Sequence, residues 1–179
     1  MASRRRSTTL PISPQSKHTF PVRFVFPRKL SRAIRSSDLR GADLLDADLQ
    51  RTNLKKAKLQ GAILEGTSLA KANLKDANLS GADLRDANLI DAILLRDTLD
   101  GANLHGAHPI EANFHRASLE DADLGFSDLR RANFDSSNLR DSDLRAANLE
   151  DANLQRADLR GADLRSANPK KSKHEWGLA

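Results

Sequence analysis

The chain has 179 residues but no cysteine, no tyrosine, one tryptophan and six prolines. Without cysteine, the fold cannot depend on disulfides or on thiolate metal sites, which fits a reducing compartment without requiring one. The longest apolar stretch, residues 20–26, is interrupted by Pro21 and Arg23. We therefore expect neither a transmembrane helix nor a secretory signal there, and stability must come from aliphatic burial.

What the chain has in abundance is leucine at a fixed spacing. Leucine or phenylalanine occupies every fifth position from Leu39 to Leu164, and Pro109 is the one exception among 26 positions. The second residue before each of these centres is Ala in 19 of the 26 cases, and otherwise Ser or Thr except at Asp97. The repeating unit is A(D/N)LXX, as in residues 81–89.

A period of five matches neither the 3.6 residues of a helical turn nor the two-residue alternation of a strand. The chain must therefore turn every five residues, and such short units bury their apolar side chains by stacking on one another. With this motif the chain resembles the pentapeptide-repeat family. The resemblance implies an all-β solenoid, a right-handed quadrilateral β-helix with four pentapeptides per coil and about 6.5 coils.

A second period of twenty residues supports four pentapeptides per coil. Glycine recurs at Gly41, Gly61, Gly81, Gly101 and Gly161. Asparagine recurs at Asn53, Asn73, Asn113, Asn133 and Asn153, with Ile93 in the remaining place. Both columns are expected if residues twenty apart lie above one another at about 4.8 Å.

The ends of the chain depart from the repeat. Residues 1–37 hold nine Lys or Arg and no acidic residue. We predict a basic disordered leader over 1–27, a short capping segment over 28–36, the β-helix over 37–169 and a capping tail over 170–179. The leader is either a plain basic tail or an organelle transit peptide. Trp176 in the tail is expected to cover the last coil.

The charges of the repeat region divide by face, if outward positions follow the resembled fold. The acidic face, containing Leu44, Leu84 and Leu124, carries the candidate residues Asp43, Asp83, Asp123, Asp143 and Asp163. The opposite basic face, containing Leu54, Leu74 and Phe114, carries Lys55, Lys75, Arg96, Arg116 and Arg156. Aligned Asp and Asn either serve the corners by bonding to backbone or form a binding surface.

Four aliphatic residues occupy positions that the repeat makes outward and polar: Ile90, Ile93, Leu95 and Ile110. We treat this aliphatic patch as a candidate interaction site, with neutral sequence drift as the alternative. Asp97 occupies a position that should be a small buried residue. A local bulge that turns Asp97 outward is expected, with Arg96 as the nearest partner for a buried carboxylate.

No catalytic or metal-binding pattern is evident, and we expect no enzyme, no cofactor and no metal. His105, His108 and His115 would lie on three different faces, and the single glycines do not form a phosphate loop. A core filled with leucine would also leave no cavity for a substrate.

Two functions follow from these features. The first is a non-catalytic protein-binding or scaffolding rod that uses the outer faces. The second comes from the resemblance, which includes quinolone-resistance proteins that imitate duplex DNA and bind DNA gyrase, a type II topoisomerase. Nucleic acid is otherwise expected only as a nonspecific contact of the leader. A weak homodimer is possible. The expected location is cytoplasmic, or a plastid or other organelle if residues 1–27 are a transit peptide.

Overall fold

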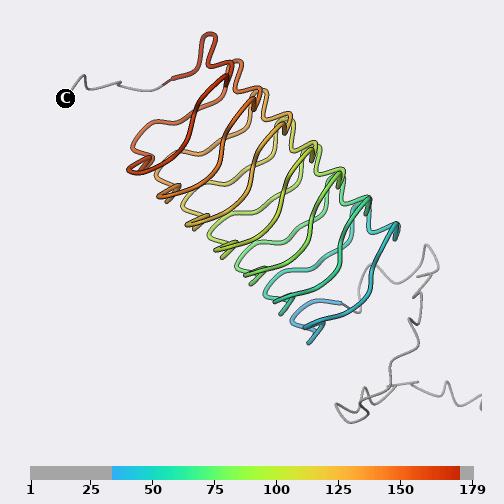
Figure 1. The fold of residues 1–179 in the computed structure, drawn as a ribbon. Helices are drawn as coiled ribbons and strands as arrows, with labels where there is room; N and C mark the ends of the chain where they lie inside the picture. Colours follow the sequence, from blue (N-terminus) through green and yellow to red (C-terminus); the bar gives the residue numbers. More distant parts are fainter. Residues whose placement is uncertain (1–33, 174–179) are drawn as a thin grey trace, which may run out of the picture.

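The computed structural model describes residues 34–173, and they wind into a square rod (Figure 1). Seven coils of twenty residues advance steadily from one end of the rod to the other. No helix or continuous strand occurs within this range, because each pentapeptide contributes a single β-bridge residue. The bridges are parallel and join residues twenty apart, from Asp38 with Lys58 to Asn153 with Lys173. This is the right-handed quadrilateral β-helix that the resemblance to the pentapeptide-repeat family implies.

Each corner of the coil is a four-residue turn. The third residue of every turn has positive φ, between 53° and 76°, as a type II turn requires. The sequence Leu84–Ala87 is an example, since Ala87 N–H donates to the Leu84 carbonyl at 3.1 Å and Asp86 has φ 55°. Most of these corner residues are not glycine. The ladders on either side hold them in a conformation that they would otherwise avoid.

Every backbone N–H of a typical pentapeptide finds an acceptor, which explains why the unit has five residues. In residues 82–86 the first N–H closes the preceding turn, the second donates to the coil below, and the third and fifth donate to the coil above. The acceptors are the carbonyls of Leu79, Ala62, Asn103 and His105, at 2.7–3.1 Å. The fourth N–H, that of Arg85, points away from the ladder and donates to Asp83 Oδ1 at 3.2 Å.

The fourth N–H explains the Asp and Asn of the repeat. Every Asp or Asn at the position before a centre, from Asp38 to Asn168, accepts such a bond from the residue two places on, at 2.8–3.4 Å. The expectation that these residues serve the backbone is thus confirmed by the geometry. Part of the asparagine column adds a side-chain ladder, because Asn153 donates to Asn133 at 3.1 Å and Asn133 donates to Asn113 at 3.3 Å.

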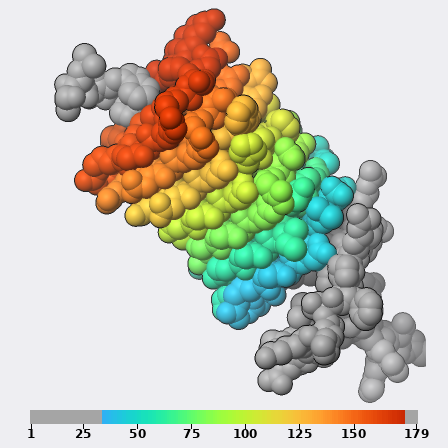
Figure 2. All heavy atoms as spheres, viewed as in Figure 1, coloured from blue at the N-terminus to red at the C-terminus, as the bar shows by residue number. Residues whose placement is uncertain are grey.

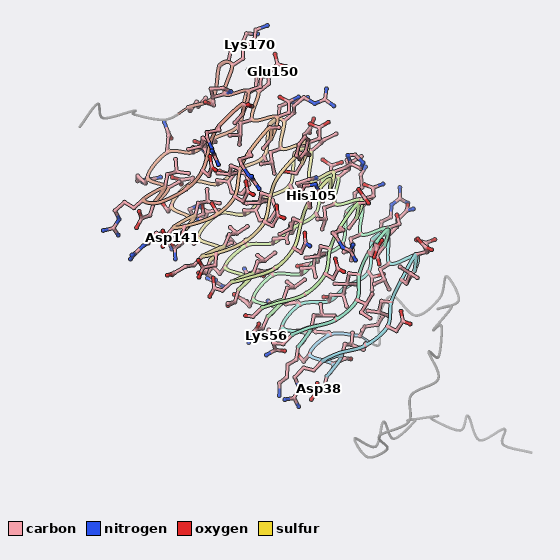
Figure 3. All side chains as sticks on the ribbon, in the orientation of Figure 1. Asp38, Lys56, His105, Asp141, Glu150 and Lys170 are labelled. Carbon is pink, nitrogen blue, oxygen red and sulfur yellow. The ribbon has the colours of Figure 1, made fainter. Side chains whose placement is uncertain are left out.

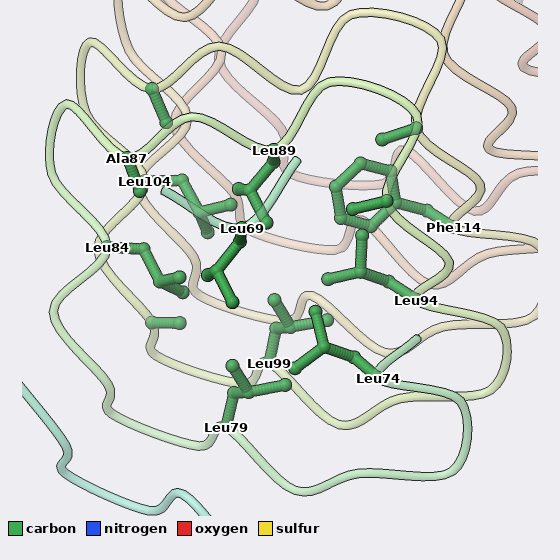
Figure 4. Close-up of a cluster of buried hydrophobic side chains, with 14 of the residues drawn as sticks. Leu69, Leu74, Leu79, Leu84, Ala87, Leu89, Leu94, Leu99, Leu104 and Phe114 are labelled. Carbon is green, nitrogen blue, oxygen red and sulfur yellow. The ribbon is translucent and has the colours of Figure 1, made fainter. Parts of the chain in front are cut away.

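The core is a continuous stack of inward leucine and alanine side chains. Figure 4 shows leucines from all four sides pointing to the middle of the coil. Centres from Leu54 to Leu154 are almost fully buried, and Phe114 stacks on Phe134 with ring centroids 4.7 Å apart. Serine replaces alanine in the core without cost where its hydroxyl has an acceptor. Ser137 Oγ, for example, donates to the Phe134 carbonyl at 2.8 Å.

Pro109 interrupts the ladder but not the coil. It occupies its centre as a buried residue, and Ala112 N–H still donates to its carbonyl at 3.1 Å. Leu89 and Leu129, the centres below and above it, donate their N–H groups to the next coil at 3.1 and 2.9 Å. Proline has no N–H, so the corresponding bond to the next coil cannot form at residue 109.

The coil extends beyond the bounds expected for it. At the start, Ser37 N–H closes a turn on the carbonyl of Ile34, which is buried in the core, so residues 34–36 belong to the first coil. At the end, Ser172 N–H donates to Pro169, and Lys173 pairs with Asn153. Residues 170–173 therefore continue the solenoid. The expected leader over 1–27, the rest of the capping segment and Trp176 lie outside the described residues.

The side-chain hydrogen bonds of Asn133 are expected to contribute measurably to the free energy of unfolding. We expect Asn133→Ala to lower the free energy of unfolding by about 1–2 kcal/mol, because the Asp135 N–H loses its acceptor and the amide ladder is broken. Lys58→Ala, at the same position of an earlier unit, is the matched control and should change it by less than about 0.5 kcal/mol. Urea unfolding of both variants tests this, and equal effects would contradict the assigned role of asparagine.

Candidate functional site

The outer walls are the surfaces that this fold offers to other molecules. Space-filling atoms show the coils as closely stacked bands along the rod (Figure 2). Because leucine and alanine fill the lumen, recognition must use side chains at the positions next to each centre and at the corners. Each wall presents these side chains in columns one coil apart.

The five candidate aspartates of the acidic face do form one column. Bridges join Asp43 to Ile63, Ile63 to Asp83, and so on to Asp163, which places Ile63 and Asn103 within the same column. The net negative charge of this column is also smaller than the number of aspartates suggests, because arginines pair with some of them. Asp83, Asp143 and Asp163 each form an ion pair with the arginine two residues later, at 2.5–2.6 Å. The acidic face is therefore broken into separate charges.

These Asp-Leu-Arg pairs recur over several walls. Arg40, Arg130 and Arg160 pair with Asp38, Asp128 and Asp158 in the same way. The side-chain hydrogen bond from Arg165 holds the pKa of Asp163 at about 2, and the one from Arg160 does the same for Asp158. Such exposed pairs contribute little to folding stability. Their main effect is on the surface, where each Asp carries its own counterion.

The basic face keeps more of its predicted character. Lys55 and Lys75 lie in one column and Arg96, Arg116 and Arg156 in the corner column beside it. Arg96 pairs with Asp76 at 2.8 Å, and Arg156 pairs with Asp135 at 2.7 Å. The pKa of Asp135 is lowered mainly by the hydrogen bond from Arg156. Figure 3 shows charged side chains projecting all along the rod, from Asp38 and Lys56 near one end to Lys170 near the other.

The aliphatic patch lies over the corner between the basic face and its neighbour, the Pro109 face (centres Leu49, Leu69, Leu89, Pro109, Leu129 and Leu149). Ile90 and Ile110 belong to the Pro109 face in adjacent coils, since Asp91 N–H donates to the Ile110 carbonyl at 3.0 Å. Ile93 and Leu95 lie on the basic face. Ile93 is 39% exposed, whereas the other three are half-buried. The structure thus stacks Ile110 above Ile90 and places Ile93 and Leu95 on either side of Leu94 on the adjoining face, with less exposed area than their positions suggested.

Asp97 corrects one expectation. No bulge forms, because Asp97 N–H still closes its turn on Leu94, and the side chain is 1% exposed. Its Oδ1 accepts from Ala77 N–H at 3.0 Å, while Oδ2 has no partner among the described residues. Arg96, the expected partner, pairs with Asp76 instead. Hydrogen bonds to the coils below and above hold the backbone of this segment in the regular coil, so the carboxyl group remains in the core.

Sequence reasoning also missed Phe126. This side chain is 66% exposed at a corner of the acidic face, the largest exposed fraction among the apolar residues described. Its ring lies 5.2 Å from that of His105, centroid to centroid. The sequence does contain a signal that could have identified Phe126. The residues twenty apart from it, at the same corner of the other coils, are all Asp, Gly, Ala or Ser. Ile63, on the same face, is 41% exposed.

The described residues contain no group of three or more His or acidic side chains that could hold a metal ion. His105, His108 and His115 lie on three different walls, as expected. Nor does any helix in the described part of the chain have the length and apolar character to cross a bilayer.

These features define a β-solenoid whose outer walls are the surfaces available for contact with other molecules. The family model for pentapeptide repeats matches residues 34–66, 62–96, 98–135 and 127–165 with eight copies. The chain belongs to the pentapeptide-repeat family. No curated protein of known function shows significant sequence similarity to it.

Among solved structures, a pentapeptide repeat protein from the Arabidopsis thaliana thylakoid lumen is 31% identical; the match covers 60% of this chain and 72% of that one, with a TM-score of 0.48. HetL from the cyanobacterium Nostoc, involved in regulating heterocyst differentiation, is 32% identical over 76% and 78% of the two chains, with a TM-score of 0.23. QnrB1, a plasmid-mediated fluoroquinolone resistance protein, is 14% identical over 82% and 86%, with a TM-score of 0.60. This last likeness concerns the fold.

The buried Asp97 predicts how stability depends on pH. Burial raises the pKa of Asp97 to about 9, and the neighbouring Asp76 carboxylate adds to the rise. The folded state therefore keeps a proton that the unfolded chain releases near pH 4, and stability is lost as the pH rises from 4 to 9. We expect Asp97→Ala to raise the free energy of unfolding by on the order of 2–5 kcal/mol at pH 8, and by less than about 1 kcal/mol at pH 4.

Thermal and urea unfolding at both pH values measure this difference. Asp151→Ala, at an exposed corner, is the control and should show no such pH dependence. An advantage of Asp97→Ala that is the same at pH 4 and pH 8 would mean that the carboxyl is not protonated in the native state.

Proposed function

We propose that this protein is a non-catalytic binding rod that holds a protein partner against its outer wall. The filled lumen supports this proposal, since it leaves the walls as the surfaces available for contact. The regular ladder also makes those walls stiff, so partner groups would meet side chains at fixed spacings. A preorganised surface loses little conformational entropy when it binds.

The observation that carries the proposal is the aliphatic patch. Outward positions of the repeat are mostly polar, charged or glycine. Apolar side chains also occur at Leu45, Ile63 and Phe126 on the acidic face, whereas Ile90, Ile93, Leu95 and Ile110 occupy two neighbouring faces in adjacent coils. Their side chains are already partly packed, and each aliphatic group removed from water adds to binding by about 25 cal/mol per Å². A small central apolar cluster with a polar rim is typical of protein interfaces.

The surroundings of the patch indicate the partner's chemistry. Lys75 lies one coil below Leu95 on the basic face, and Arg116 lies in the coil above. Arg96, beside Leu95, is paired with Asp76, and the corner residues Asp91 and Glu111 are paired with Lys71 and Arg131. We infer that the partner presents apolar side chains together with acidic ones, because its carboxylates would neutralise Lys75 and Arg116. A second copy of the chain, bound through its own acidic face, is the competing occupant.

Replacing Ile90 and Ile110 with serine tests the patch. We expect the double variant to keep its fold, since both side chains are only half-buried, and to lose at least tenfold in affinity for the partner, or about 1.4 kcal/mol. The partner is first identified by capture with the full-length chain and then titrated in purified form by calorimetry. Ile63→Ser, on the acidic face, is the matched control.

Unchanged affinity in the double variant would remove the patch from the proposal. Self-association is followed in parallel by sedimentation velocity. Loss of a dimer without loss of partner binding would identify the patch as a contact between copies of this chain.

Imitation of duplex DNA remains the alternative function, and the charge pattern counts against it. A DNA mimic needs a continuous row of unneutralised negative charges, whereas Asp83, Asp143 and Asp163 pair with arginine and Ile63 interrupts the column. We expect the purified protein neither to inhibit DNA gyrase nor to protect it from a quinolone in a supercoiling assay. Inhibition that disappears in an Asp123→Asn variant would support mimicry instead.

For the compartment we propose the cytoplasm, because a chain without cysteine needs no oxidising environment for disulfide formation. A plastid or other organelle is the alternative if residues 1–27 are a transit peptide. The basic leader is also the segment through which we propose any nonspecific, salt-sensitive contact with nucleic acid.

A further inference from the structure

The fold does not explain why a phenylalanine, Phe126, occupies its corner position. The corresponding corner residues of the other coils are Asp46, Gly66, Asp86, Gly106, Ala146 and Ser166. Phe126 has φ 56°, a conformation unfavourable for a bulky side chain, and its ring is 66% exposed. It gains no burial in the core in return. A residue that strains the backbone and exposes an aromatic ring is better explained by a contact with another molecule.

The neighbours of Phe126 form a defined arrangement around the ring. The His105 ring lies against Phe126, tilted by 51°, and its Nδ1 is 3.4 Å from Asp123 Oδ1. Gly125 makes room for this cluster. A Cβ there would lie 3.0 Å from Asp123 Oδ1 and 3.1 Å from His105 Nδ1, closer than ordinary packing allows. His105 lies midway along the rod in Figure 3.

Two carboxylates lie near this corner. The Asp123 carboxylate is next to the His105 ring that contacts Phe126. Asp86 lies two coils below Phe126 in the same corner column, and because Gly106 between them has no side chain, the Asp86 carboxylate extends to within 2.5 Å of where a Cβ of residue 106 would be. The nearest arginines of this face are already engaged, Arg85 with Asp83 and Glu65, and Arg145 with Asp143.

An exposed aromatic ring with carboxylates nearby has the chemistry that recognises a cation. We propose that Phe126, Asp123 and Asp86 form a docking point for an arginine or lysine side chain of a protein partner. The cation lies on the free face of the Phe126 ring, and the carboxylates supply the opposite charge. A purely apolar partner would desolvate both carboxylates without adding a cation beside them, and a nucleic acid would add further negative charge.

This inference rests on the proposed function, because it assumes that the rod binds protein. It adds a second contact point at a different corner, with the opposite partner chemistry from the aliphatic patch. A partner that spans both would place basic and acidic segments on different walls, which fixes its orientation on the rod.

The test uses the full-length chain and a defined probe, the peptide acetyl-Gly-Arg-Gly-Arg-Gly-amide. We expect it to shift the NMR signals of Phe126, His105 and Gly125 selectively and in a saturable way. The same peptide with citrulline in place of arginine keeps the shape and hydrogen-bonding amide but lacks the charge. It should bind at least fivefold more weakly.

Variants separate the site from the general charge of the face. Phe126→Ser and Asp123→Asn should each lower the association constant at least fivefold. Serine already occupies this corner position at Ser166 with φ 61°, so the fold should persist, as unchanged amide signals in distant coils would verify. Ile63→Ser and Asp43→Asn, on the same face, are the controls and should change it less than twofold.

Equal binding of the citrulline peptide, equal binding by Phe126→Ser, or shifts spread along the whole acidic face would each overturn the proposal. So would a nuclear Overhauser contact between the Phe126 ring and an arginine of residues 1–33 in the free chain, which would place the chain's own leader there. The Ile90→Ser, Ile110→Ser variant should bind the peptide normally. Failure at Phe126 therefore leaves the aliphatic patch, and the proposed function, untouched.

Discussion

The parallel hydrogen-bond ladder between successive coils is the constraint on which the rest of the structure depends. It joins the residue before most centres to its counterparts twenty places before and after it, so the register of the coil cannot shift by even one residue without disrupting every wall. The ladder also holds corner residues such as Arg96 and Phe126 in a left-handed conformation that isolated chains rarely adopt. Local preference is overridden because neighbouring coils determine the backbone from both sides.

This constraint explains how the molecule treats irregular residues. Pro109 loses one ladder bond and the coil continues, while Asp97 stays in the core with an unpaired Oδ2 because no bulge can form. Ser137 is tolerated because its hydroxyl finds the carbonyl of its own turn. The turns and ladder bonds on either side of these residues are retained, whether or not the substituted side chain finds a hydrogen-bond partner.

The same regularity shapes the surface. Asp and Asn before each centre are first of all acceptors for a backbone N–H, so a column of aspartates is no proof of a binding site. Arginine two residues later then neutralises many of them. What distinguishes one wall from another is the residues that break the pattern: the aliphatic patch on one corner and Phe126 with His105 on another.

By itself, the sequence determined the architecture. A strict five-residue period with Ala and Leu inward admits hardly any other backbone path, and the twenty-residue columns give the number of units per coil. Sequence also predicted which residues share a wall, because that follows from counting. The tertiary structure alone decided what those neighbours do. Whether Asp163 is free or paired, whether Asp97 turns outward, and how far Ile90 and Phe126 project depend on side-chain conformations and on the coils above and below. Repeat periodicity places each Cα, but the energies that select among rotamers and partners arise only once the coils are stacked.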